Sequence, residues 1–185
     1  IFAGLRFGRS TMKIVMKFGG VSVADGDKVR KVGTIVRKFH KEGHRMVVGT
    51  SAMYGVTDSL AEIAKKASHG QKESVREFMD SLMLKHKKTA ESAIMDERIL
   101  KHAMEIVNAR GDELRNILLG IAHIGELTPR SKDFVLGYGE KLSTPILHGV
   151  IEDLGMKSRA LTGGEAGIVT DDHYGEANPL MSVTT

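Results

Sequence analysis

A chain of 185 residues with 41% hydrophobic and 27% charged residues has the composition of an ordinary globular protein, and it is long enough to bury a core as one domain. The absence of cysteine excludes disulfide bonds, thiolate metal sites and cysteine nucleophiles, which fits a cytoplasmic protein. The net charge of +4 comes from basic residues interleaved with acidic ones, and no apolar run could span a membrane, so the sequence argues against nucleic-acid and membrane partners.

The first eleven residues are unusual for the start of a chain. They contain Arg6 and Arg9 but have no long apolar segment and no cleavage site, so they lack the pattern of a signal peptide. Met12 stands directly before the first strand-like run. We therefore expect residues 1–11 to be a disordered or non-native extension, and the folded part to begin at Met12.

The first half of the chain alternates between two kinds of apolar pattern. Residues 13–18 predict a buried strand, and residues 25–41 predict a helix with one apolar face, which Gly43 ends. Residues 45–51 predict a second buried strand, and residues 55–68 a second helix. This order and spacing indicate a parallel sheet with crossover helices.

Helical periodicity dominates the middle of the chain. Residues 71–90 and 96–124 predict two long helices, and we expect Gly111 to bend or divide the second. A further helix is predicted over residues 129–154, with a kink at Pro145. These helices form an insertion between the segments of the sheet.

Sheet structure is predicted to resume near the end of the chain. Residues 157–162 predict a strand, and the polar loop over residues 163–179 contains a second short strand at residues 167–170. The fold class is therefore α/β. The sheet has so few strands that we expect it to be incomplete.

An anion site is predicted where the first strand ends. Lys17 and Phe18 are followed by Gly19 and Gly20, and a helical pattern comes next. Glycines let backbone N–H groups approach a ligand closely, while a helix N-terminus and the Lys17 ammonium add positive charge. The expected ligand is a nucleotide phosphate, and the alternative interpretation is a simple turn.

Three further side chains are candidates for binding. Ser51 and Thr57 follow the second predicted strand and could hold a carboxylate, although Thr57 or Asp58 could equally serve only as a helix cap. Glu140 lies within the predicted helix 129–154, where it either complements the helix dipole or binds a substrate ammonium. The eight histidines lack metal-ligand spacing, and no Walker A pattern occurs, so no protein metal site and no P-loop are predicted.

Four segments resemble the motifs of aspartate kinases, which belong to the amino-acid kinase superfamily. Lys17–Ala24 is similar to the opening signature of that family, Ser51–Asp58 to its second motif and Phe134–Ser143 to its third. Residues 167–172 with 174–177 resemble the loop after the next strand. The four segments occur in the family's order. The resemblance implies a three-layer αβα sandwich with a mainly parallel sheet, the amino-acid kinase fold.

The resemblance implies an enzyme that transfers the γ-phosphate of ATP to the β-carboxylate of L-aspartate, the first step of lysine, threonine and methionine biosynthesis. Its cofactors would be ATP and Mg²⁺. Carried over by position, Lys17 would be catalytic, Ser51 and Thr57 would hold aspartate, and Glu140 would pair with its α-amino group. The residues implied at the nucleotide phosphates are Lys17, Phe18, Gly19 and Gly20. A carboxylate nucleophile is already ionised at neutral pH and needs no general base. The full-length parent is expected to be a homo-oligomer.

Two departures from the family pattern restrict what the resemblance implies. Val21 replaces the usual Thr, and the family's Gly-Arg-Gly-Gly-Ser-Asp motif and its regulatory ACT domains do not occur in the sequence. Residues 12–185 are therefore expected to be the N-terminal part of a kinase domain without most of its ATP-binding part, and inactive alone. The parent could be monofunctional or a bifunctional aspartokinase–homoserine dehydrogenase. The alternatives are another amino-acid kinase, or a non-catalytic half-domain that binds a partner or self-associates through unpaired sheet edges.

Overall fold

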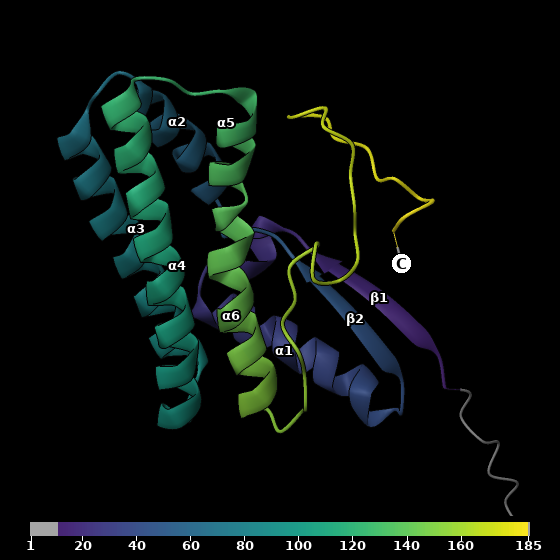
Figure 1. The fold of residues 1–185 in the computed structure, drawn as a ribbon. Coiled ribbons are helices and arrows are strands. Elements are labelled where there is room, and N and C mark those ends of the chain that lie inside the picture. Colours follow the sequence, from purple (N-terminus) through teal and green to yellow (C-terminus); the bar gives the residue numbers. More distant parts are fainter. Residues whose placement is uncertain (1–10, 185) are drawn as a thin grey trace, which may run out of the picture.

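A computed structural model describes residues 11–184 of the protein. In it two parallel strands pack with one face against helices (Figure 1). The extension predicted over residues 1–11 lies outside the described residues, apart from Thr11. The elements in chain order are β1 (Lys13–Phe18), the 3₁₀ helix η1 (Gly20–Val23), α1 (Gly26–Lys41), β2 (Arg45–Thr50), α2 (Val56–Ser68), α3 (Lys72–Ala93), α4 (Glu97–Ile124), α5 (Pro129–Leu136) and α6 (Tyr138–Asp153).

The two strands have the predicted positions and the predicted parallel pairing. Their register runs from Lys13 opposite Arg45 to Phe18 opposite Thr50, with α1 as the crossover helix. Alternate residues of both strands are exposed, because helices α1 and α6 pack on one face only; Val15 is 78% exposed and Val47 is 64% exposed. The prediction that both strands are buried is therefore wrong for one face of the sheet in the described part of the chain.

Helix α6 lies at the centre of the helical part. It contacts α1, α2, α3, α4 and α5, and Figure 1 shows it upright beside α3 and α4. Its apolar side chains are almost completely buried, as are the predicted apolar faces of α2, α3 and α4. The largest of these buried aliphatic side chains are Leu60, Met79, Leu114, Leu118, Leu142 and Ile146. Full burial of such a side chain contributes roughly 1.5–3 kcal/mol, so most of the hydrophobic stabilisation lies between the helices.

The structure leaves one predicted long helix whole and divides the other. Helix α4 runs unbroken through Gly111, which is buried against α3: a Cβ there would lie 2.5 Å from the sulfur of Met83. The helix predicted over residues 129–154 is divided at Gly137, which ends α5 and precedes α6, whereas Pro145 lies inside the continuous α6. A proline removes one N–H from the helical hydrogen bonds, and here the helix continues past the buried Pro145.

The two strands predicted near the end of the chain are absent from the described residues. Residues 157–162 and 167–170 are irregular, with one isolated bridge between Thr170 and Pro179. A strand needs a neighbouring edge to satisfy its backbone, and this segment pairs with neither β1 nor β2. The backbone N–H of Gly175 donates to Asp133 and so ties the segment to α5. No helix in the described part is both long and apolar enough to cross a bilayer.

Candidate functional site

The glycine pair after β1 forms a tight turn, but the helix that follows it directly is short. Gly19 is extended, and its carbonyl accepts a hydrogen bond from the Ser22 N–H at 2.9 Å, which begins η1. The long helix α1 starts only at Gly26, where the Asp25 carboxylate accepts from the Lys28 N–H. The predicted positive end of α1 is therefore capped by an acidic side chain and does not point at the glycine pair as a free N-terminus.

Lys17 and Ser51 meet where the two parallel strands end. The Lys17 ammonium donates a hydrogen bond to the Ser51 hydroxyl oxygen at 2.9 Å. Lys17 is paired in register with Gly49, and a Cβ on Gly49 would lie 3.0 Å from the Lys17 Cδ, so this glycine leaves room for the lysine stem. The ammonium retains further protons, and the Ser51 hydroxyl retains its own, so both groups can still bind oxygen atoms of a ligand.

Glu140 reaches the same loop from the first turn of α6. Its Oε1 atom accepts a hydrogen bond from the Ala52 N–H at 3.0 Å, and its second carboxylate oxygen remains available. The contact is close, because a Cβ on Gly139 would lie 2.5 Å from the Ala52 Cβ. A Cβ on Gly20 would likewise lie 2.9 Å from the Ala52 carbonyl oxygen. The glycine turn, the loop after β2 and the start of α6 therefore converge on Ala52.

Ser143 belongs to this site although sequence reasoning did not single it out. It is only 4% exposed, and its hydroxyl donates to the Ser51 carbonyl at 2.8 Å, with the Glu140 carbonyl at 3.3 Å. The sequence spacing could have indicated it. Residues three apart on a helix share a face, so Ser143 lies on the same side of α6 as Glu140. What the sequence could not show was that the Ser51 carbonyl lies opposite that face.

Thr57 is placed differently from the other predicted site residues. It is exposed in the first turn of α2, and no hydrogen bond of its side chain occurs with the described residues. The prediction that Thr57 or Asp58 caps α2 is wrong, since the cap position is occupied by Gly55 with φ +76°. The loop that precedes α2 is held by Lys85 of α3, which donates to the Tyr54 carbonyl at 2.8 Å.

The charges of the site complement an amino acid. Lys17 offers an ammonium, Ser51 a hydroxyl and Glu140 a carboxylate. These groups come from the end of β1, the loop after β2 and the first turn of α6, which meet at Ala52. Such a set can bind a ligand that carries both an anionic and a cationic group. Phe18, by contrast, packs against the core with a half-buried ring, so only its backbone is close to the glycine turn.

Lys141 does not join this site, although it is the neighbour of Glu140. Its ammonium lies 4.5 Å from the ring centroid of Phe134 and 4.3 Å from that of Tyr138. Burial, together with the nearby Arg110 cation, lowers the pKa of Lys141 below its ordinary value. The aromatic faces stabilise the cation there, and the side chain contributes to packing between α5 and α6.

The glycine turn offers hydrogen-bond donors that fit a nucleotide phosphate, whereas no cluster among the described residues fits a metal ion. Within residues 11–184, the N–H groups of Gly19 and Gly20 have no hydrogen-bond acceptor, and no side chain caps η1. Together with the exposed Lys17 ammonium, these donors suit phosphate oxygens. The same residues contain no group of three or more His, Cys, Asp or Glu side chains that could hold a metal ion.

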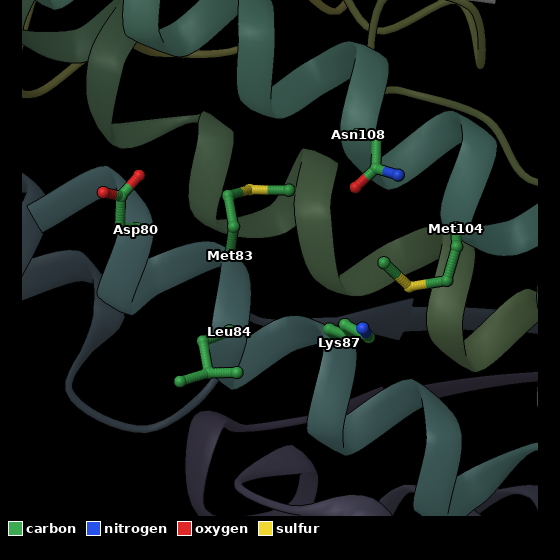
Figure 2. Close-up of a pocket in the computed structure, with 6 residues that line it drawn as sticks. All are labelled: Asp80, Met83, Leu84, Lys87, Met104 and Asn108. Atoms are coloured by element: carbon green, nitrogen blue, oxygen red, sulfur yellow. The ribbon is translucent and has the colours of Figure 1, made fainter. Parts of the chain in front are cut away.

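A pocket elsewhere on the helices lacks comparable chemistry. It has a volume of about 430 Å³ and lies between α3 and α4 (Figure 2). Its lining residues are Asp80, Met83, Leu84, Lys87, Met104 and Asn108. The Asp80 carboxylate is already paired with Arg115 at 2.9 Å, and the pocket shares no residue with the convergence at Ala52. The strand ends therefore remain the candidate site.

Comparison with known proteins agrees with the resemblance of the motifs. The model of the family described as "Amino acid kinase family" matches residues 12–183. Aspartokinase 1, chloroplastic, of Arabidopsis thaliana is 31% identical over 162 residues, which cover 86% of this chain and 27% of that protein. Bifunctional aspartokinase/homoserine dehydrogenase, chloroplastic, of Daucus carota is 33% identical over 147 residues, which cover 80% of this chain and 16% of that protein. The chain thus spans about a quarter or less of the length of these relatives.

A solved structure shares the fold. The crystal structure of E. coli aspartokinase III in complex with aspartate and ADP superposes with a TM-score of 0.76 at 19% sequence identity. The match covers 95% of this chain and 36% of that chain. At this identity the likeness concerns the arrangement of helices and strands.

Proposed function

Because the chain belongs to the amino acid kinase family, we propose that it forms part of an aspartate kinase, which transfers the γ-phosphate of ATP to the β-carboxylate of L-aspartate. The predicted α/β class and amino-acid kinase fold are confirmed by the parallel strands and by the shared fold of the solved aspartokinase. The observation that carries the proposal is the convergence of Lys17, Ser51 and Glu140 around Ala52. The names of the similar proteins support aspartate as the substrate.

The proposed roles follow from the charge of each group. Lys17 would stabilise negative charge on the transferring phosphoryl group, because phosphoryl transfer depends on positioning and charge neutralisation. The Ser51 hydroxyl would donate to a carboxylate of aspartate, and the free oxygen of Glu140 would accept from its α-ammonium. The substrate β-carboxylate is ionised at neutral pH, so none of these residues has to remove a proton.

The cofactors proposed are ATP and Mg²⁺. Lys17 and the N–H groups of Gly19 and Gly20 would hold the nucleotide phosphates, which agrees with their lack of acceptors in the described part of the chain. When bound, the nucleotide supplies the phosphoryl group, and Mg²⁺ on its phosphates neutralises part of their charge. Since the described residues contain no acidic cluster, we propose that the phosphates themselves are the main ligands of the ion.

We further propose that residues 12–185 are the N-terminal part of a kinase domain. Two facts support this: the chain matches only 27% of the Arabidopsis relative, and the Gly-Arg-Gly-Gly-Ser-Asp motif is not among its residues. The chain alone would then bind aspartate weakly without turnover, and homo-oligomers would form in the full-length parent. Cytoplasmic location remains a prediction, since two of the similar plant proteins are named as chloroplastic.

A binding experiment on this chain tests the substrate. We expect L-aspartate to bind more tightly than L-glutamate in NMR titrations, and hydroxamate formation with ATP to stay at background. The substitution Glu140→Gln should weaken aspartate binding about 10- to 100-fold, because it removes a charged partner of the ammonium. Glu152→Gln is the matched control, since Glu152 lies on the same helix about 18 Å further along.

Three results would contradict the proposal in different ways. Tighter binding of L-glutamate would favour another amino-acid kinase. Absence of aspartate binding, or equal effects of Glu140→Gln and Glu152→Gln, would remove the proposed site. Robust turnover by this chain would reject its assignment as an incomplete kinase domain.

A further inference from the structure

We propose that Ser143 is a positioning residue, which fixes the peptide group between Ser51 and Ala52 and thereby aligns both halves of the amino-acid site. The inference rests on the proposed function and deepens it. The Ser143 hydroxyl donates to the Ser51 carbonyl at 2.8 Å, and Glu140 accepts from the Ala52 N–H at 3.0 Å. This carbonyl and this N–H belong to the same planar peptide unit. Helix α6 therefore holds both ends of one rigid group.

The two sides of that peptide carry the two binding functions. The Ser51 side chain leaves the Cα atom on the carbonyl side and accepts from Lys17 at 2.9 Å. The Ala52 N–H on the other side holds Oε1 of Glu140. A shift of this peptide away from α6 would carry the Ser51 Cα atom and its hydroxyl away from Lys17, and it would carry the Ala52 N–H away from Glu140. The placement of one peptide thus couples the carboxylate-binding and ammonium-binding halves of the site.

The surrounding contacts make Ser143 the link that ties this carbonyl to α6. Thr50 also donates to the Ser51 carbonyl, at 3.2 Å, but it is the preceding residue and cannot anchor the peptide to another element. Ser143 is buried, at 4% exposure, and comes from α6. Because the Thr50 hydroxyl continues to satisfy the carbonyl, removal of the Ser143 hydroxyl should loosen the peptide without unfolding the protein.

Close backbone approach leaves the peptide little other freedom. The absence of a side chain on Gly139 allows α6 to touch Ala52, and the absence of one on Gly20 allows the glycine turn to reach the Ala52 carbonyl. These contacts set how closely the loop can approach α6, whereas hydrogen bonds restrain the Ser51–Ala52 peptide from moving away from the helix. Ser143 therefore acts through Ser51 and Glu140 rather than through contact with a substrate.

The test measures the peptide and the ligand separately in this chain. In Ser143→Ala, we expect hydrogen exchange of the Ala52 amide to accelerate about tenfold and the Kd for L-aspartate to rise about tenfold, the loss typical of one hydrogen bond. The matched control is Thr144→Val, which is nearly isosteric and removes only a bond to the Glu140 carbonyl within the helix. The control should change both quantities less than twofold.

The outcomes distinguish this inference from the proposed function. Wild-type exchange at Ala52 and unchanged aspartate affinity in Ser143→Ala would overturn the positioning role. If the wild-type chain does not bind aspartate, the proposed function fails, and Ala52 exchange alone decides whether Ser143 fixes the peptide. If thermal unfolding shows that Ser143→Ala does not fold, Ser143→Cys carries the same two measurements, since it keeps the volume and replaces the hydroxyl by a weak donor.

Discussion

The helices and the sheet of this molecule enclose their side chains to very different degrees. Leu142 and Ile146 of α6 are at most 1% exposed, surrounded by five other helices, whereas Val15 and Val47 on the open face of the sheet are 78% and 64% exposed. Since hydrophobic stabilisation grows with buried apolar area, the free energy of folding comes mainly from the helices. The sheet contributes chiefly the positions of Lys17 and Ser51 at its strand ends.

The candidate site lies where these two regions meet. The sheet supplies the ammonium and the hydroxyl, and α6 supplies the Glu140 carboxylate and the Ser143 hydroxyl. Helix α6 is packed tightly, and its hydrogen bonds to the loop after β2 fix the positions of the groups at that strand end. We therefore expect substitutions inside the helices to change stability, and substitutions at the strand ends to change binding.

The largest expected effect concerns the helical core. Leu118→Ala in α4 should lower the free energy of unfolding by about 2–5 kcal/mol, because Leu118 is fully buried and the change leaves a cavity. On the open face of the sheet, Val15→Ala and Lys17→Met should change the free energy of unfolding by less than about 0.5 kcal/mol. Urea denaturation of the three variants measures these values. A loss in Val15→Ala as large as that in Leu118→Ala would contradict the division between the two regions.

A second effect tests whether polar contacts also hold the helices together. Arg30 of α1 donates to the Asp153 carboxylate of α6 at 2.6 Å and to the Ala93 carbonyl at 2.7 Å, and the Asp153 side chain is only 5% exposed. Arg30→Met should cost about 3 kcal/mol of unfolding free energy, since it leaves a buried carboxylate without its cation.

The matched control for this pair is Arg98→Met, in which an arginine that is 94% exposed loses a 3.5 Å contact with Asp96. It should cost less than about 0.5 kcal/mol, as is usual for exposed ion pairs. Equal losses in the two variants, measured by thermal and urea unfolding, would show that Arg30 acts only as a surface charge.

The sequence predicted those parts of the structure that depend on local pattern. The strands at residues 13–18 and 45–50 and the apolar faces of α2, α3 and α4 follow from periodicity alone. The strand predicted at residues 157–162 failed because strand formation needs a partner edge, which no local pattern contains. The break at Gly137 was not predicted, and the kink at Pro145 stays a prediction, since Pro145 lies inside α6.

The site shows the same division between local and tertiary information. Lys17, Ser51 and Glu140 were recognisable from their motifs. The structure brings them together through the hydrogen bond from Lys17 to Ser51 at 2.9 Å and the one from the Ala52 N–H to Glu140 at 3.0 Å. Ser143 was not predicted, because its role depends on a carbonyl that lies 92 residues earlier in the chain. Thr57 stays a prediction, since its exposed side chain makes no hydrogen bond with the described residues.

The smallest expected effect is a pH dependence that arises in the helices. His86 of α3 is fully buried, its Nδ1 contacts the Leu82 carbonyl at 2.8 Å, and its Nε2 has no hydrogen-bond partner among the described residues. Burial lowers the pKa of His86 in the folded protein, so the unfolded chain binds the proton more readily. The free energy of unfolding should therefore fall as the pH drops below about 6.5, by at most about 1.4 kcal/mol per pH unit.

Urea denaturation between pH 7.5 and about pH 5.5 measures this dependence, in the range where histidine titrates. His86→Gln should flatten the curve over that range, because the replacement does not titrate. His102→Gln should leave the curve unchanged, since the His102 side chain is 65% exposed and lies outside the packed helical core. A pH dependence that persists in His86→Gln but disappears in His102→Gln would place the titrating group on the surface. The pH dependence of the unfolding free energy would then not arise from the buried His86 in the helical region.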